Sequence, residues 1–448
     1  GARAFNGPLM ITPEKTKLIT RLFVVKPENV DEDIYNIMAD QDYVEGSSFA
    51  FPLQKLDDAL LYIQNARKLY GEEAVTVDDP GAIGKEESDG TCKVKNLKFE
   101  VFVSQGTYYP YRTVSGQYDY SRGNTFLVPE GVSIYGGVSH KKAEGKDGAF
   151  YTQHSYQADR VTDADDVIIT SSGKTITLKA TNTRKILDGR ELEDLNHNSI
   201  REPWEMKNQT ILSGKSVNSE SADNVYHVIT CIADEDYVGT LPEGTSETSS
   251  LIIADTEREY TGVPIVLDGL QIMDGKAMGY DKSSVTNAYT YYRGGGVLVD
   301  GNWFKATRTD EGELPESDEN YTRAADPRSV GRRSIPLTVR NCEFTNNRAG
   351  AGGAIFSNGV VELYSCNFAQ NAAKRRAETD APAAAQRSNG NGGAVFSSYV
   401  LSAVNTIFAN NEVGVAEETG DLSLLDEVGS RGGAVFHAAN GQYGSMQL

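Results

Sequence analysis

The sequence is poor in cysteine and tryptophan, and it has no long hydrophobic run. Only 4 of its 448 residues are Cys and 2 are Trp. Four cysteines are too few for a fold held together by disulfides, and none of them forms the CxxC pair that is typical of structural zinc sites. No apolar run approaches the ~18 residues that a membrane-spanning helix needs. We therefore expect no transmembrane segment in this chain.

Basic residues are fewer than acidic residues. The chain has 43 Lys and Arg against 63 Asp and Glu, which gives a formal net charge of −20 at pH 7. Because affinity for nucleic acids depends on clustered Lys and Arg, we expect no nucleic-acid partner. Hydrophobic residues make up 39% and charged residues 24% of the chain, a composition typical of folded rather than disordered proteins.

The two ends of the chain also lack expected features. The sequence begins at Gly1 without Met and without a signal peptide, so either a leader has been removed or Gly1 is left over from expression. No capping element follows the last repeat motif before Leu448. We expect the natural protein to continue beyond this residue.

A repeat organises the second half of the chain. Segments with a Phe-x-x-Asn motif align at 341–347, 365–371 and 405–411, and each is followed by a Gly-Gly-Ala-Ile/Val-Phe motif at 352–356, 392–396 and 432–436. The doublets at 352 and 392 lie 16 residues before Phe368 and Phe408 of the following Phe-x-x-Asn motifs, and Phe344 lies 8 residues before its doublet, so the basic period is 24 residues. In the two later repeats, 16 more residues are inserted between Phe and doublet.

A unit of this length, made of short alternating runs broken by Gly and Asn, is typical of one coil of a parallel β-helix. We therefore predict an all-β fold, a right-handed parallel β-helix solenoid with an N-terminal capping helix and several inserted loops. Matching residues of successive coils should form the columns Phe344/Phe368/Phe408, Val339/Leu363/Ala403 and Asn347/Asn371/Asn411. The Gly-Gly doublets should form corners that need positive φ or close backbone approach.

The repeat also predicts the domain organisation. Residues 1–52 form an N-terminal lead segment, and 53–448 form a single β-helix. Leu residues at helical spacing predict a capping helix over 53–70, which would cover the open end of the first coil. Insertions are expected near 276–293, 302–334, 373–390 and 413–430.

The Phe-x-x-Asn motif alternating with Gly-Gly-Ala-Ile/Val resembles the repeats of the chlamydial polymorphic outer-membrane protein family. The front part of the chain is similar to secreted right-handed β-helix proteins of the Bacteroidetes, in the order of five motifs. These motifs are Gly46-Ser47-Ser48-Phe49, the 53–70 helix, 103–110, 132–137 and 210–214. The resemblance reaches from about residue 46 to residue 436 and implies export and display at the cell surface.

Residues 194–205 have the ligand spacing of a calcium loop. Asp194, Asn196 and Asn198 occupy positions 1, 3 and 5, and Glu205 occupies position 12, as in an EF-hand-type loop that ends in a bidentate carboxylate. Ser199 replaces the turn glycine, and positions 3 and 5 are amides. The sequence predicts a calcium site here; the alternative is an Asn-rich surface loop whose side chains bond its own backbone.

A cluster of tyrosines precedes the first glycine-rich corner. Its members are Tyr280, Tyr289, Tyr291 and Tyr292. Exposed aromatic rings stack well on sugar rings, so the cluster is a candidate carbohydrate-binding surface; the alternative is that the rings pack against the coil. Cys342 and Cys366 occupy matching positions in successive coils, where we favour free buried thiols over a disulfide.

These observations indicate a secreted or outer-membrane-surface protein that acts as an adhesin-like binding module, with glycans or host surface proteins as partners. The alternative is a polysaccharide-active β-helix enzyme, a lyase or a glycoside hydrolase. Such an enzyme needs paired carboxylates or a base near a calcium ion. Acidic pairs such as Asp57-Asp58 occur, but they have no equivalent one coil away, and we assign no catalytic residue.

Overall fold

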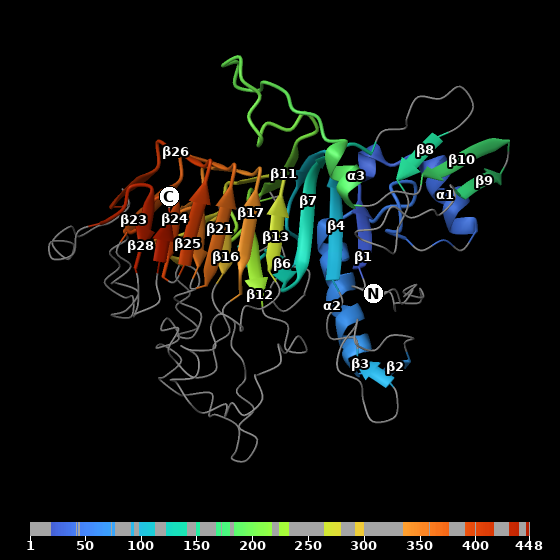
Figure 1. Cartoon of the computed structure of the whole chain (residues 1–448), viewed down its shortest axis with the longest axis horizontal. Helices are drawn as coiled ribbons and strands as arrows, with labels where there is room; N and C mark the ends of the chain where they lie inside the picture. Colours follow the sequence, from blue (N-terminus) through green and yellow to red (C-terminus); the bar gives the residue numbers. More distant parts are fainter. Residues whose placement is uncertain are drawn as a thin grey trace, which may run out of the picture. The chain divides into compact units, whose positions relative to one another are not determined.

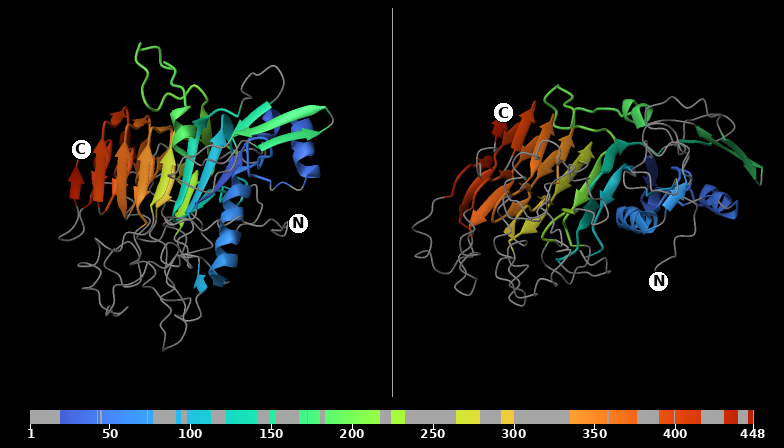
Figure 2. Two further views of the ribbon diagram at one scale, coloured as in Figure 1. Left: turned by 45° about the vertical axis from the view of Figure 1, so that its right-hand side comes forward. Right: turned by 60° about the horizontal axis from the view of Figure 1, so that its bottom comes forward.

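The computed structural model describes most of the regular structure of the chain. The described residues are 19–41, 43, 45–72, 74–76, 91–93, 98–112, 122–140, 149–152, 167–171, 173–179, 183–216, 224–232, 264–278, 292–299, 335–357, 359–375, 390–398, 400–415, 430–438 and 445–447. The fold is mostly β with few helices (Figures 1 and 2), which agrees with the predicted all-β class.

The chain forms two compact units, and each unit is made of three separate stretches of the sequence. Unit 1 comprises 1–108, 131–211 and 268–270, and unit 2 comprises 109–130, 212–267 and 271–448. From the sequence we expected residues 1–52 to form a lead segment and 53–448 to form a single solenoid. Residues 19–24, within 1–52, form a strand of the main sheet of unit 1.

Unit 1 is built on three parallel strands in the order β1 (Ile19–Val24), β4 (Lys98–Ser104) and β7 (Val132–Val138). The register aligns Phe23 with Phe102 and Phe102 with Tyr135, so their rings stack at centroid distances of 5.5 and 5.2 Å. The remaining elements are η1 (Pro27–Asn29), α1 (Glu32–Asp40), α2 (Leu56–Glu72), β2 (Ala74–Thr76), β3 (Thr91–Lys93), β5 (Gly106–Tyr108), β8 (Ala149–Thr152), β9 (Val167–Ser171), β10 (Lys174–Lys179) and α3 (Thr183–Asp188). The strand β11 (Thr210–Ser213) has residues in both units.

A helix is present where the capping helix was predicted, with bounds shifted toward the C-terminus. Its expected range was 53–70, whereas α2 spans Leu56–Glu72. Leu53 is not helical because its carbonyl accepts the N–H of Val25 and its own N–H bonds to Phe23, so it extends along β1. Leu56 and Ile63 are buried on the inner face of α2, and the helix packs against β1 and β4.

Unit 2 is a stack of short parallel strands in four sheets, an arrangement consistent with a β-helix. Figure 1 shows β17, β21 and β25 side by side in one of them. The first sheet has the order β13 (Ile265–Asp268), β17 (Leu337–Arg340), β21 (Val360–Tyr364), β25 (Val400–Val404) and β29 (Ser445–Gln447). The second has the order β14 (Leu270–Met273), β18 (Glu343–Thr345), β22 (Asn367–Ala369) and β26 (Ile407–Ala409).

The other two sheets of unit 2 follow the same rule. The third has the order β6 (Phe126–Pro129), β12 (Ile229–Ile232), β16 (Val297–Val299), β20 (Ile355–Ser357), β24 (Val395–Ser397) and β28 (Val435–His437). The fourth has the order β15 (Lys276–Ala277), β19 (Arg348–Ala349), β23 (Ala372–Arg375) and β27 (Glu412–Val415). Consecutive strands along the chain belong to different sheets, and we call each passage through the four sheets a coil.

The predicted side-chain columns are confirmed. Phe344, Phe368 and Phe408 are register partners, with ring centroids 4.6 and 5.1 Å apart. The same holds for the column Val339/Leu363/Ala403. Cys342 and Cys366 are buried free thiols, as favoured from the sequence.

Asparagines at one corner form a ladder between coils. The Oδ1 atom of Asn371 accepts the backbone N–H and the Nδ2 of Asn347, both at 3.1 Å. The Nδ2 of Asn371 donates to the carbonyl of Phe344 at 2.9 Å and to Oδ1 of Asn411 at 3.0 Å. Asn347 and Asn371 are fully buried, so each amide satisfies backbone groups that the corner leaves without a sheet partner.

The glycine doublets form the corners with positive φ and close backbone approach that the sequence predicted. Gly352 and Gly392 have φ values of +62° and +70°. A side chain on the second glycine of a doublet would meet the next coil, because a Cβ on Gly393 would lie 2.0 Å from the carbonyl oxygen of Gly433. Both conditions exclude larger residues.

We predict that Asn371→Ala lowers the free energy of unfolding by roughly 2–4 kcal/mol, because it leaves buried donors and acceptors of two neighbouring coils without partners. Urea denaturation followed by circular dichroism measures the change. The control is Asn405→Gly, since Asn405 is exposed and has φ +50°, a conformation that Gly adopts readily. Equal stability of Asn371→Ala and the wild type would contradict the ladder.

A second prediction concerns acid. His227 is buried, its Nδ1 lies 2.9 Å from the carbonyl oxygen of Gly294, and burial lowers its pKa to about 4. Between pH 6.5 and 4 the unfolded chain binds a proton here that the folded chain does not, so stability falls as pH falls through this window. The loss is at most about 1.4 kcal/mol per pH unit.

The comparison of wild type with His227→Asn, in urea titrations at pH 7 and pH 5, isolates this contribution. Asn keeps a donor for the carbonyl of Gly294 but does not titrate. We expect a smaller pH-dependent loss in the variant than in the wild type. Equal losses in both proteins would show that His227 is not the group responsible.

Candidate functional site

The predicted calcium loop lies in unit 1 and closes on itself. Leu192 and Met206 form an antiparallel bridge at its base, and Trp204 and Met206 are buried beneath it. His197 and Ser199 have φ values of +58° and +69°, so Ser199 adopts the turn conformation that glycine usually supplies in such loops. The departure from glycine at this position is therefore accommodated by the backbone.

The four sequence-predicted ligands are brought together in this loop. The carboxylate of Asp194 accepts the N–H groups of Asn198 and Ser199 at 3.0 and 2.9 Å. The Oδ1 of Asn196 accepts the N–H of Asn198 at 3.0 Å, and Glu205 accepts the N–H of Asn196 at 3.0 Å. Loop side chains thus bond the loop backbone, as the alternative interpretation predicted, and such bonds also hold ligands in place in calcium loops.

Glu202, which the sequence analysis did not single out, lies in the same loop. Its carboxylate accepts Nδ2 of Asn198 at 2.6 Å. Burial, and then the neighbouring carboxylate of Glu202, raise the pKa of Glu205, whereas hydrogen bonds lower the pKa of Glu202. The loop therefore concentrates negative charge that a cation would stabilise.

The donor set fits calcium only with amide oxygens included. In the part of the chain that the structure describes, no three His, Cys, Asp or Glu side chains lie close enough together to hold a metal ion. A calcium ion would be held by the carboxylates of Asp194 and Glu205 together with Oδ1 of Asn196 and Asn198. Calcium accepts such mixed oxygen ligands, so the four side chains of this loop fit the predicted calcium site.

The tyrosine cluster is described at one residue. Tyr292 is 3% exposed, and its carbonyl accepts the N–H groups of Gly350 and Ala351. Its ring therefore offers no open face for stacking on a sugar. Tyr280, Tyr289 and Tyr291 lie outside the described residues, as do 302–334 and most of the other predicted insertions.

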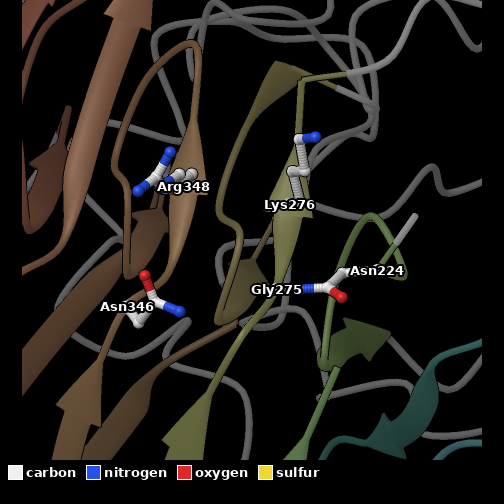
Figure 3. A pocket seen from close by; sticks show the side chains of 5 residues that line it. All are labelled: Asn224, Gly275, Lys276, Asn346 and Arg348. Atoms are coloured by element: carbon white, nitrogen blue, oxygen red, sulfur yellow. The ribbon is translucent and has the colours of Figure 1, made fainter. Parts of the chain in front are cut away.

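A pocket in unit 2 gives a second candidate site, which the sequence analysis missed. It has a volume of about 170 Å³ and is lined by Asn224, Gly275, Lys276, Asn346 and Arg348; we call it the basic pocket. Figure 3 shows the two cationic side chains on one side of this space and the two amides on the other. Lys276 and Arg348 are register partners on β15 and β19.

Hydrogen bonds fix the wall of the basic pocket. Arg122 donates from Nε to the carbonyl of Asn224 at 3.0 Å and from Nη2 to the carbonyl of Lys276 at 2.9 Å. The guanidinium of Arg122 also lies over the ring of Tyr226, 4.3 Å from its centroid. Arg122 thus ties together the backbone of two coils at two residues that line the pocket.

A buried acid anchors the opposite side of the pocket. The carboxylate of Asp274 accepts Nδ2 of Asn346 at 2.6 Å, and Lys215 lies 3.7 Å from its other oxygen. Since Nδ2 of Asn346 donates to Asp274, the amide oxygen of Asn346 is the side-chain atom that can accept a hydrogen bond from a ligand. Lys215 offsets part of the charge of Asp274, and Lys276 and Arg348 are the two cationic residues in the lining of the pocket.

The repeat contained a signal for this pocket. Residues 267–272 have the spacing of 339–344, and extending that alignment places Lys276 opposite Arg348, which lies 72 residues later in the sequence but in the next coil. The alignment of coils rather than any local motif therefore identifies the basic pair. Asn224 belongs to a coil with no such motif, so no sequence pattern indicates its place in the pocket.

The calcium hypothesis makes a direct prediction. Millimolar CaCl₂ should raise the thermal unfolding midpoint of the wild type by several degrees, because a ligand that binds only the folded state stabilises it. Asp194→Ala should abolish this rise. The matched control is Asp188→Ala, which removes an exposed acid of α3 in the same unit and should keep the rise. A wild-type midpoint that does not respond to calcium rejects the hypothesis in favour of a self-bonded loop.

Comparisons with known proteins identify no relative. No family model, no curated protein and no solved structure matches this chain. Among the helices of the described part, none is both long and apolar enough to cross a lipid bilayer.

Proposed function

We propose that this chain is a right-handed parallel β-helix solenoid, closed at its N-terminal end by α2, that acts as an adhesin-like binding module for carbohydrate. In this proposal the protein is secreted or displayed at an outer-membrane surface, as its resemblance to the Bacteroidetes β-helix proteins and to the chlamydial repeats implies. Glycans or host surface proteins are its partners. The stacked parallel sheets of unit 2 support the solenoid.

One observation carries the binding role. Three long stretches of sequence, 279–291, 376–389 and 416–429, follow β15, β23 and β27, which all belong to the same four-stranded sheet. Between β15 and β23 lies β19, which continues to its corner glycine without an insertion. Insertions that all follow strands of one sheet leave the stacking of the other strands undisturbed. Inserted connecting segments commonly carry binding residues.

The basic pocket adds a second support. It is lined by Lys276 of β15 and Arg348 of β19, which belong to that same sheet, and by the polar side chains of Asn224 and Asn346. Sites that recognise polar ligands place a few directed hydrogen-bonding groups on a fixed framework, and the bonds of Arg122 and Asp274 provide such a framework here.

The test measures both binding and turnover. The purified chain is applied to an array of neutral and acidic glycans, and the same glycans are incubated with it in solution and assayed for new reducing ends and for absorbance of unsaturated uronates. We expect retention without turnover. Turnover would favour the polysaccharide-active enzyme, a lyase or a glycoside hydrolase. The absence of both retention and turnover would contradict the carbohydrate role.

A further inference from the structure

The basic pocket concentrates positive charge on a strongly acidic protein. The chain has a formal net charge of −20, yet Lys276 and Arg348 are aligned side by side on neighbouring strands, which lie about 4.8 Å apart. Like charges directly opposite each other on adjacent strands are destabilising. In the next two coils the same column holds Ala372 and Glu412, so the stack itself does not require a cation at this position.

The surroundings leave the charge of Arg348 available. Arg348 is exposed, and Lys276 is half-buried. Among the described residues no carboxylate lies within ion-pair distance of Arg348, whereas Lys374, on the same sheet, pairs with Glu412 at 2.8 Å. The nearest acid of the pocket, Asp274, is buried and engaged by Asn346 and Lys215.

The chemistry of the lining defines the ligand. Guanidinium and ammonium groups bind carboxylate and sulfate through charge-assisted hydrogen bonds. The amides of Asn224 and Asn346 add neutral groups that can donate to or accept from hydroxyls. A ligand that meets both demands carries an anionic group and hydroxyls on the same small framework.

The size of the pocket limits what it holds. Its volume of about 170 Å³ lies below the roughly 300–1,000 Å³ of pockets that enclose drug-sized ligands. Because Asn346 and Arg348 are exposed, the pocket is open to solvent, and a ligand bound in it can continue beyond it. These features suit one residue of a longer chain.

We propose that the basic pocket binds one acidic sugar residue of an anionic polysaccharide, with the carboxylate or sulfate on Arg348 and Lys276 and the ring hydroxyls on Asn224 and Asn346. This proposal rests on the carbohydrate-binding function and names the class of glycan and the residues that select it. The clamp of Arg122 on two backbone carbonyls keeps the pocket in its binding geometry before the ligand arrives.

The experiment uses the full chain and isothermal titration calorimetry. The probes are a hyaluronan hexasaccharide, which carries carboxylates only, a chondroitin sulfate hexasaccharide, which carries carboxylates and sulfates, and neutral cellohexaose. Inorganic sulfate is the fourth probe. We expect binding of one or both acidic oligosaccharides, weaker binding as NaCl is raised, and little binding of cellohexaose or inorganic sulfate. The two acidic probes distinguish a carboxylate from a sulfate as the recognised group.

The decisive variant is Arg348→Gln, which removes the charge of an exposed side chain. It should weaken binding of the acidic oligosaccharide about 10- to 100-fold, the range expected for loss of a hydrogen bond to a charged group. Lys374→Gln is the matched control, because it removes one positive charge from the same sheet outside the pocket. It should bind as the wild type does.

Each other outcome counts against a defined part of the proposal. If Arg348→Gln and the wild type bind the acidic oligosaccharides equally well, the pocket assignment is overturned, but the carbohydrate function still stands. Equal binding of cellohexaose would overturn the preference for acidic sugar. Inorganic sulfate bound as tightly as the oligosaccharides, with the same loss in Arg348→Gln, would make the pocket a simple anion site. Binding of no glycan would contradict the proposed function together with this inference.

Discussion

Parallel pairing in one register between successive coils is the constraint on which unit 2 depends. Because each strand hydrogen-bonds to the matching strand of the next coil, residues one period apart must lie over one another. Large apolar side chains can then stack as flat rings, and buried asparagines can bond to one another along the stack. A shift of one residue would turn every one of these columns toward the opposite face. The register therefore determines both the stacked apolar core and the asparagine ladder at the corner.

The same register also places functional groups. Positions facing inward are tied to their columns by packing, whereas outward positions are not, and the column Lys276, Arg348, Ala372 and Glu412 changes character from coil to coil. The stack can thus hold two cations beside each other at one height and an ion pair at another without altering the backbone. Binding specificity can be set by outward residues on a framework that internal hydrogen bonds keep fixed.

The sequence predicted unit 2 much better than unit 1, for physical reasons. The repeated motifs required stacked coils and identified the Phe, Val/Leu/Ala and Asn columns. The strand β1 and the helix α1 have no repeat, and β1 carries Arg21, whose buried pairing with Glu100 depends on a residue 79 positions away. In the candidate sites, the loop 194–205 was found because its groups are close in sequence. The basic pocket was missed because it joins three coils and needs the register to assemble.

Dipolar coupling between two spin labels tests the register most directly. Glu362 and Ser402 are register partners on β21 and β25, 40 residues apart in sequence, and both are half-buried. With the four native cysteines replaced by alanine, cysteines at these two positions would carry the labels. We expect strong dipolar broadening, because neighbouring strands lie about 4.8 Å apart. A spectrum equal to the sum of the two singly labelled proteins would contradict it.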